Sequence, residues 1–311
     1  QNQITCLFKN PSKRSGISLL VAIGTILVSA AASEVANAAP PIERGTFTVN
    51  QIDREQWREV RFKQTFSKVP VVILGPASFQ GGDPLTYLVK DVTKEGFKYQ
   101  LREWEYLSNG NHAKETFSYL AVEPGQHNVG GQLWEAGLRD FPNPNRKVVT
   151  TQSAFTSPPI VLAQPVAETS VVPRLKDVTA TGFRLSLQTE QALPHTAATP
   201  AKCGWIAISQ GIVAASGLRS NAANTGKIVK HQWKEIALSH PRGAQPSLFA
   251  TVQTYAGPDP VSVRYRNFTN QKVDLRLQEE ASGDPEMGHV TEEIGYLILG
   301  DVQPRDILTS G

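Results

Sequence analysis

Apolar and polar side chains alternate with a period of two in three separate segments of the chain. In GFKYQLREW (96–104), Phe, Tyr and Leu alternate with Lys, Gln and Arg, and the same alternation occurs in GFRLSLQTE (182–190) and KVDLRLQEE (272–280). This period predicts a β-strand with one buried and one wet face. No sustained helical pattern follows residue 38. We therefore expect an all-β protein built from antiparallel sheets.

The three segments lie in longer stretches that resemble one another. VKDVTKEGFKYQL (89–101), RLKDVTATGFRLSL (174–187) and RNFTNQKVDLRL (266–277) match position by position. The residues V-T-x-x-G before the first two strands predict a turn in which Gly96 and Gly182 supply positive φ. Each copy ends in an apolar strand, namely YLAVEPG (119–125), WIAISQG (205–211) and YLILG (296–300). These closing strands are apolar on both faces, so the opposite sheet and a neighbouring copy are the expected covers.

The spacing of the copies predicts three tandem β-sandwich repeats. We place them at 42–126, 127–211 and 212–301, with a tail at 302–311. Their period, 86–90 residues, is far longer than a solenoid unit, so each copy is expected to be a small domain.

The first 38 residues have the pattern of a secretory signal. Basic residues precede the apolar run ISLLVAIGTILVSAA (17–31), and Ala36-Asn37-Ala38 is a small-residue cleavage pattern. Cleavage near Ala38 would release the chain to the periplasm, the medium or the cell surface. No long apolar segment follows, so we expect no membrane span in the mature chain.

Charge and cysteine content exclude several classes of protein. The net charge is +3 without a Lys/Arg-rich run, which argues against nucleic acid as a partner. Only Cys203 remains after the signal, so burial rather than disulfides must stabilise the fold. We assign Cys203 to the core, and since no nucleophile or nucleotide-binding motif is found, we expect no enzyme and no cofactor.

The segments PPIVL (158–162), DVTATGF (177–183) and WIAI (205–208) resemble the H-type lectin domain, as does EWEYLSNGNHAKETFSYLAVEPG (103–125) in the first copy. The resemblance implies a six-stranded antiparallel sandwich and N-acetylgalactosamine-type ligands bound near subunit contacts. Because family members often form trimers, three copies in one chain suggest an intrachain pseudo-trimer.

In that family an aromatic residue three positions after the last strand leucine contacts the sugar. Here the position holds Trp104, Glu190 and Glu280 in the three copies, so only the first keeps the aromatic. By alternation Trp104 falls on the wet face, where an exposed ring would stack on a sugar; the alternative is packing on a sheet rim. The next family residue is a polar contact, and here it is Glu105.

A second set of polar residues is shared by the first and third copies alone. The first copy has Asp83, His112 and Glu115, and the third has Asp259, His289 and Glu292. The second copy has Thr169, Ala198 and Ala201 at these positions. Because the three residues were lost together, we expect them to act together.

Three interpretations of this second set remain open. It is a buried polar network that ties a loop to the sandwich, a set of ligand contacts at a loop end, or a metal site. His and Glu alone are too few for zinc, so no metal is assigned. Our prediction is an exported carbohydrate-binding or adhesion protein that contacts its ligand through Trp104, Glu105 and the second set. The alternative is a structural or protein-interaction module of the cell surface.

Overall fold

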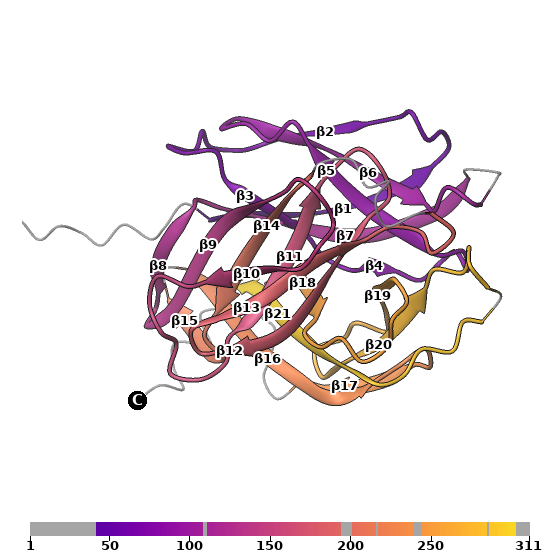
Figure 1. Cartoon of the computed structure of the whole chain (residues 1–311). Helices are drawn as coiled ribbons and strands as arrows, with labels where there is room; N and C mark the ends of the chain where they lie inside the picture. The colour runs from indigo at the N-terminus through magenta and orange to yellow at the C-terminus, as the bar shows by residue number, and fades with distance from the viewer. Residues whose placement is uncertain are drawn as a thin grey trace, which may run out of the picture. The chain divides into compact units, whose positions relative to one another are not determined.

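The computed structural model describes residues 42–107, 111–193, 201–215, 217–238, 244–284 and 286–302. Within these residues every regular element is a β-strand (Figure 1), which confirms the all-β class. The predicted export signal, and the predicted tail beyond Val302, lie outside the described residues. Among the described residues, no helix has the length and apolar character needed to cross a membrane.

The strands between residues 42 and 122 form two facing sheets, the first sandwich. The sheet orders are β1-β7-β3 and β2-β6-β5, and neighbours are antiparallel. One hydrophobic cluster, with Phe97 and Phe117 from opposite sheets, fills the space between them. The strands are β1 (Ile42–Gln51), β2 (Arg58–Arg61), β3 (Val71–Leu74), β5 (Leu85–Lys90), β6 (Gly96–Glu103) and β7 (His112–Val122), and β4 (Ala77–Ser78) lies beyond β3.

The same strand order recurs twice more along the chain. The second sandwich pairs β9-β14-β11 with β10-β13-β12, and the third pairs β16-β21-β18 with β17-β20-β19. The second contains β9 (Gln132–Phe141), β10 (Lys147–Thr150), β11 (Ile160–Val166), β12 (Val172–Thr179), β13 (Gly182–Gln188) and β14 (Ala201–Ile208). The third contains β16 (Leu218–Val229), β17 (Lys234–Ala237), β18 (Ala244–Val252), β19 (Val261–Arg266), β20 (Lys272–Glu279) and β21 (Glu292–Asp301).

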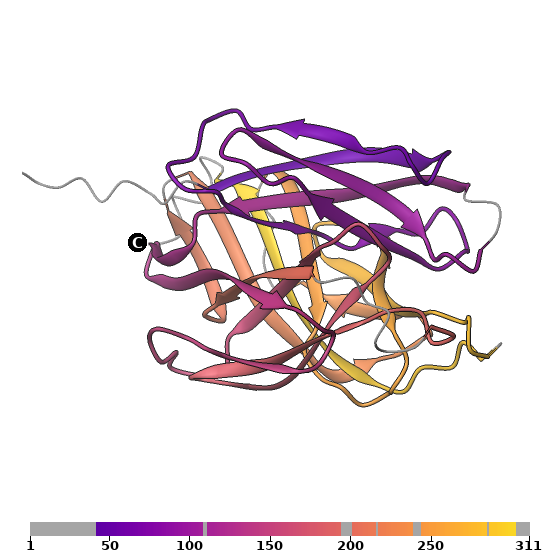
Figure 2. The ribbon, with the colours of Figure 1, turned by 45° about the horizontal axis from the view of Figure 1, so that its top comes forward.

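Two short strands start the hairpins that lead from one sandwich to the next. β8 (Gly125–Val129) pairs with β9, and β15 (Gly211–Ala215) pairs with β16. Figures 1 and 2 show the three groups of strands side by side, in purple, in magenta to red, and in orange to yellow. The division into three repeats at the bounds given above stays a prediction, since an equal order of strands does not by itself show that the three segments are copies of one another.

The turn before β6 differs from the prediction in one respect. Positive φ is found at Asp91, Asp177 and Asn267, with values of 50°, 54° and 50°. Gly182 has a φ of 154°, as predicted, whereas Gly96 has no positive φ. Asp and Asn tolerate this region better than other residues with a Cβ. Gly96 is instead needed for a close approach, because a Cβ there would lie 2.2 Å from the carbonyl oxygen of Val60.

The wet face predicted for the three alternating strands is only partly correct. Their apolar side chains are buried as expected. Arg184 is exposed, but Gln100 and Gln278 are 2 % and 1 % exposed. Gln100 is covered because its amide donates to the backbone carbonyls of Arg54 and Gln56, which cross the outer face of β6. Sequence alternation cannot report such coverage by a distant segment.

A central core joins the three sandwiches. One cluster of buried side chains draws on strands of all three, including Leu120 and Val122 of β7, Ile206 of β14, and Leu297 and Leu299 of β21. The other faces of these strands line the core of their own sandwich. A neighbouring sandwich therefore covers the second face of each closing strand.

Candidate functional site

A buried carboxylate, Glu115 of β7, lies where the first sandwich meets the third. It accepts hydrogen bonds from the amides of Gln80 and Gly81, both at 2.9 Å, and from the Ser78 hydroxyl at 2.5 Å. Arg264 of β19 reaches it from the third sandwich, with Nη2 to Oε1 at 2.6 Å, and neither side chain is exposed. This ion pair therefore connects two sandwiches inside the protein.

The third sandwich carries a matching carboxylate, Glu292 of β21, at its contact with the second. The amides of Ala256 and Gly257 donate to it at 2.8 and 3.1 Å, and the Thr254 hydroxyl donates as well. Its cation is Arg174 of β12, at 3.0 Å, and both side chains are fully buried. The two contacts thus use the same positions in the same order around the molecule.

A histidine extends each ion pair by one step. His112 lies between two carboxylates, with Nε2 3.2 Å from Glu115 and Nδ1 3.0 Å from Glu103. His289 does the same in the third sandwich, 3.2 Å from Glu292 and 2.7 Å from Glu279. Each set therefore links an arginine, a carboxylate, an imidazole and a second carboxylate in one buried chain.

Hydrogen bonding and charge set the ionisation of these groups. Burial opposes ionisation of Glu292, but hydrogen bonds from His289, Thr254 and two amides outweigh it and lower its pKa to about 2. Burial likewise opposes the charged form of His289, yet its two carboxylate partners raise its pKa. Glu115 follows the same logic, and its pKa is lowered by His112 and Arg264 against the cost of burial.

The second sandwich lacks this network at every position. The residues that correspond to Ser78, Asp83, Glu103, His112 and Glu115 are Ala167, Thr169, Thr189, Ala198 and Ala201. The arginine position is also empty of charge, since Leu88 of the first sandwich corresponds to Arg174 and Arg264. Because the arginine comes from a neighbour, it is absent from the first sandwich, whereas the other members are absent from the second.

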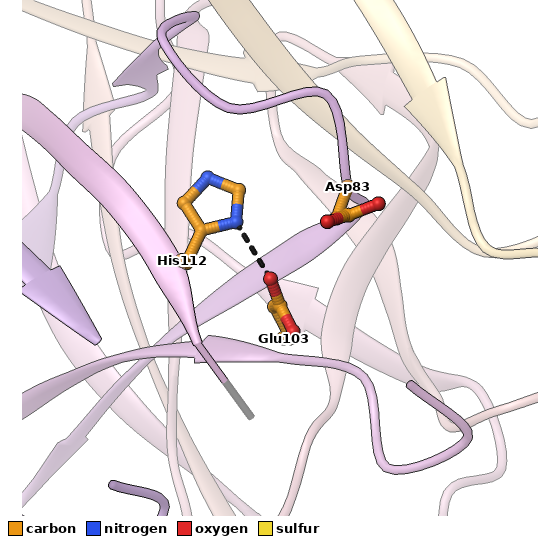
Figure 3. A group of neighbouring side chains, drawn as sticks. All are labelled: Asp83, Glu103 and His112. Carbon is orange, nitrogen blue, oxygen red and sulfur yellow. Dashed lines mark hydrogen bonds and ion pairs between the residues drawn. The ribbon is translucent and has the colours of Figure 1, made fainter. Parts of the chain in front are cut away.

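Two members of the first network, Glu103 and His112, lie close to Asp83 (Figure 3). Asp83, Glu103 and His112 each offer a ligand atom, and these atoms all lie within 4.8 Å of one another. They come from the loop before β5, the end of β6 and the start of β7. Asp83 is exposed and the other two are buried. The predicted Asp and His are thus brought together, whereas Glu115 lies on the far side of the imidazole.

Of the two interpretations of Trp104, the exposed ring is wrong, because the side chain is packed inside the protein. Trp104 is only 1 % exposed, although it follows directly after the polar-face positions of β6. The guanidinium of Arg54 donates to the carbonyl of Trp104 at 2.9 Å and holds the segment of residues 53–57 over this edge of the sheet. The ring therefore presents no open face for stacking.

Glu105 lies at the contact between the first and second sandwiches. Its Oε1 forms an ion pair with Nε of Arg102 at 3.0 Å and accepts a hydrogen bond from the Ser170 amide of the second sandwich at 3.3 Å. Glu190 accepts from the Tyr106 amide at 3.0 Å, and burial, with the negative charge of Glu105, raises the pKa of Glu190 to about 7. Part of the Glu105 side chain stays accessible, at 31 %.

Four residues of these networks were not predicted from the sequence: Glu103, Glu279, Arg174 and Arg264. Glu103 carried a usable signal, because Glu279 corresponds to it in the third copy and Thr189 in the second. It therefore follows the same pattern of loss as Asp83 and His112. Each arginine belongs to a different sandwich from the glutamate that it pairs with. The arginines can therefore be assigned to the networks only when it is known which sandwiches are in contact.

Part of the chain is similar in sequence to a known protein family. Residues 57–122 match the H-type lectin domain. This H-type lectin match begins at Trp57, just before β2, and ends with β7, so it contains the Asp83 group and Glu115. No curated protein and no solved structure matches the chain. The match indicates a lectin-like, carbohydrate-binding function for this region.

Proposed function

We propose that the protein is an exported, non-catalytic carbohydrate-binding protein made of three H-type-lectin-like sandwiches packed as an intrachain pseudo-trimer. The observation that carries the proposal is the H-type lectin match at residues 57–122. The repeated strand order, the left-handed turn at three equivalent positions and the shared central core support the pseudo-trimer. The signal pattern before residue 39 supports export.

The sugar contacts are proposed at the accessible polar groups near the edge of the first sandwich. Asp83 is exposed and Glu105 is partly exposed, so their carboxylates are free to accept hydrogen bonds from hydroxyl groups. His112 and Glu115 are buried and act by positioning the loop that carries Asp83. The third sandwich has a weaker candidate, since Asp259 is half-buried and bonded to Gln191 of the second.

A glycan array probed with the chain after removal of the signal tests the proposal directly. We expect retained glycans, with Asp83→Asn and Glu105→Gln each weakening binding about tenfold through one lost charge-assisted hydrogen bond. The matched control is Asp140→Asn, which alters an exposed carboxylate of the second sandwich. Binding of no glycan, or binding that is equal in all three variants, would contradict the proposal.

A structural or protein-interaction module remains the second candidate. It is favoured by the burial of Trp104, and by the use of His112, Glu115, His289 and Glu292 to hold sandwiches together. Under this function a protein partner binds and free sugars do not displace it. Competition of that partner with the glycans on the array separates the two candidates.

A further inference from the structure

The Asp83 group has a donor set suited to a metal ion. One imidazole and two carboxylates from three separate elements bring their ligand atoms within 4.8 Å of one another (Figure 3). Nitrogen and oxygen donors in this ratio suit Zn²⁺ and related divalent transition ions. Because the elements are a loop and two strand ends of one sandwich, the fold holds the donors in place without the ion.

Glu103 has bonding capacity that the protein does not use. It is fully buried, and its Oε2 has no hydrogen-bond partner among the described residues. Burial raises the pKa of Glu103, and the charge of Asp83 adds to the effect although His112 opposes it. A buried carboxylate oxygen without a donor is uncommon in folded proteins and calls for a cation or a proton. Rotation about its last side-chain torsion would turn either oxygen toward the group.

The imidazole is oriented as in a metal site. His112 Nδ1 faces Glu103, while Nε2 is held by Glu115 at 3.2 Å. Glu115 is fixed in turn by two backbone amides and by Arg264. Metal-bound histidines usually donate their other N–H to a carboxylate held in this way, which sets the tautomer and the ring direction.

We propose that Asp83, Glu103 and His112 Nδ1 bind a divalent transition metal ion, with Zn²⁺ as the best match to the donors. The ion replaces the proton between Nδ1 and Glu103, which is released to solvent, and it offsets the charge of two carboxylates. Three protein ligands leave further coordination positions on the side of the exposed Asp83, for water or a hydroxyl group. Glu115 is a positioning residue. The proposal does not depend on sugar binding.

The third sandwich provides an internal contrast. The side-chain amide of Gln191, from the second sandwich, donates to Asp259. Burial, together with the charge and a hydrogen bond of Glu279, raises the pKa of Asp259. The residue that corresponds to Gln191 at the first site is Ala281, which has no side-chain amide that could donate to Asp83. We therefore place the ion in the first sandwich and not in the third.

The test uses the whole chain, stripped with a chelator and dialysed, with no sugar present. Titration calorimetry with Zn²⁺ and absorption spectra with Co²⁺ are expected to give one ion per chain. Asp83→Asn should weaken Zn²⁺ binding at least tenfold, and since Asp83 is exposed this variant keeps the fold. Glu115→Gln should weaken it about tenfold, the usual effect of a group that orients a metal ligand.

Asp259→Asn is the matched control and should bind Zn²⁺ as the unmodified chain does. Circular dichroism of each variant separates lost binding from lost fold. Absence of one-to-one binding, or an equal affinity of Asp83→Asn and the unmodified chain, overturns the metal site. A tenfold loss in Asp259→Asn with none in Asp83→Asn also overturns it, because the ion would then lie in the third sandwich.

Discussion

The contact between the first and third sandwiches differs in kind from the contact between the first and second. The former contains the buried pair Glu115–Arg264, whereas the latter has Ala201 and Leu88 at the corresponding positions. At that second contact, Val89 of β5 pairs with Val166 of β11, and Thr86 bonds to Ser170 at 3.3 Å. The corresponding contact is thus built once without a fully buried ion pair and twice with one, since the pair Lys90–Glu168 between the first two sandwiches is partly exposed.

The difference shows where the absence of a buried ion pair is visible in the amino-acid sequence. A charged pair survives only if both members remain, because a single buried charge without its partner is costly. Since the two partners lie in different sandwiches, the missing glutamate and the missing arginine are found in different sandwiches as well. Aligning the copies alone finds Asp, His and Glu, while the arginines are found only with the order of neighbours.

Removing the arginine alone should break the charged contact most severely. Arg264→Leu leaves Glu115 buried beside the His112–Glu103 pair, and we expect it to lower the free energy of unfolding by roughly 3–5 kcal/mol. Chemical denaturation measures the change. The double variant Arg264→Leu/Glu115→Ala, which copies the uncharged contact, should be less destabilised than the single one. A single variant within 1 kcal/mol of the unmodified chain, at about the precision of such a comparison, would contradict this.

Acid should weaken the contact that contains Glu292. Its pKa is lowered to about 2 in the folded state, so the stabilisation is present above the unfolded pKa near 4.5 and is lost as the pH falls toward 2. A shift of this size corresponds to about 3 kcal/mol. Unfolding measured between pH 6 and 2 should show a shallower loss for Glu292→Gln, starting from a lower stability. Parallel curves for the two chains would contradict the expectation.

The meeting point of the three sandwiches should respond to pH in the opposite sense. The pKa of Glu190 is raised to about 7, so the folded state binds more protons than the unfolded state between the two pKa values. Stability should fall as the pH rises from about 4.5 through 7, by at most about 3 kcal/mol and less where water screens the charge. Glu190→Gln should remove this slope, and a slope that persists in the variant would assign it to another group.

The smallest expected effect concerns the ion pairs beside the left-handed turns. Asp91 bonds to Lys98 at 2.9 Å on the surface of the first sandwich. Both side chains are largely exposed, so Lys98→Ala should change the free energy of unfolding only slightly. Thermal denaturation measures it, with Arg184→Ala at the equivalent position of the second sandwich as a matched control. A loss several times larger would show that this turn is a critical element of the fold.

The strands were predictable because their side-chain pattern is local. Phe97, Phe183 and Val273 are buried as the alternation requires, and the closing strands are covered on both faces. Gln100 and Trp104 were not predictable, because what covers them is a segment about 50 residues earlier. Periodicity reports the two faces of a sheet and carries no information on what crosses a face.

The candidate site was predictable in membership and less so in geometry. Copy comparison identified Asp83, His112 and Glu115 as a set, and the structure brings His112 close to each of the other two. It did not identify Glu103, which bonds to His112 from a different strand. The spacing along one strand suggested that His112 and Glu115 could bind one ligand together. In the structure the carboxylate grouped with His112 and Asp83 is that of Glu103, from β6.

The central core has a consequence for the number of copies. Leu120, Ile206 and Leu297 meet in one shared interior that no single sandwich encloses. A truncated chain with only one or two of the sandwiches would expose this apolar surface to water. We expect such a chain to aggregate or to form oligomers that bury the surface again.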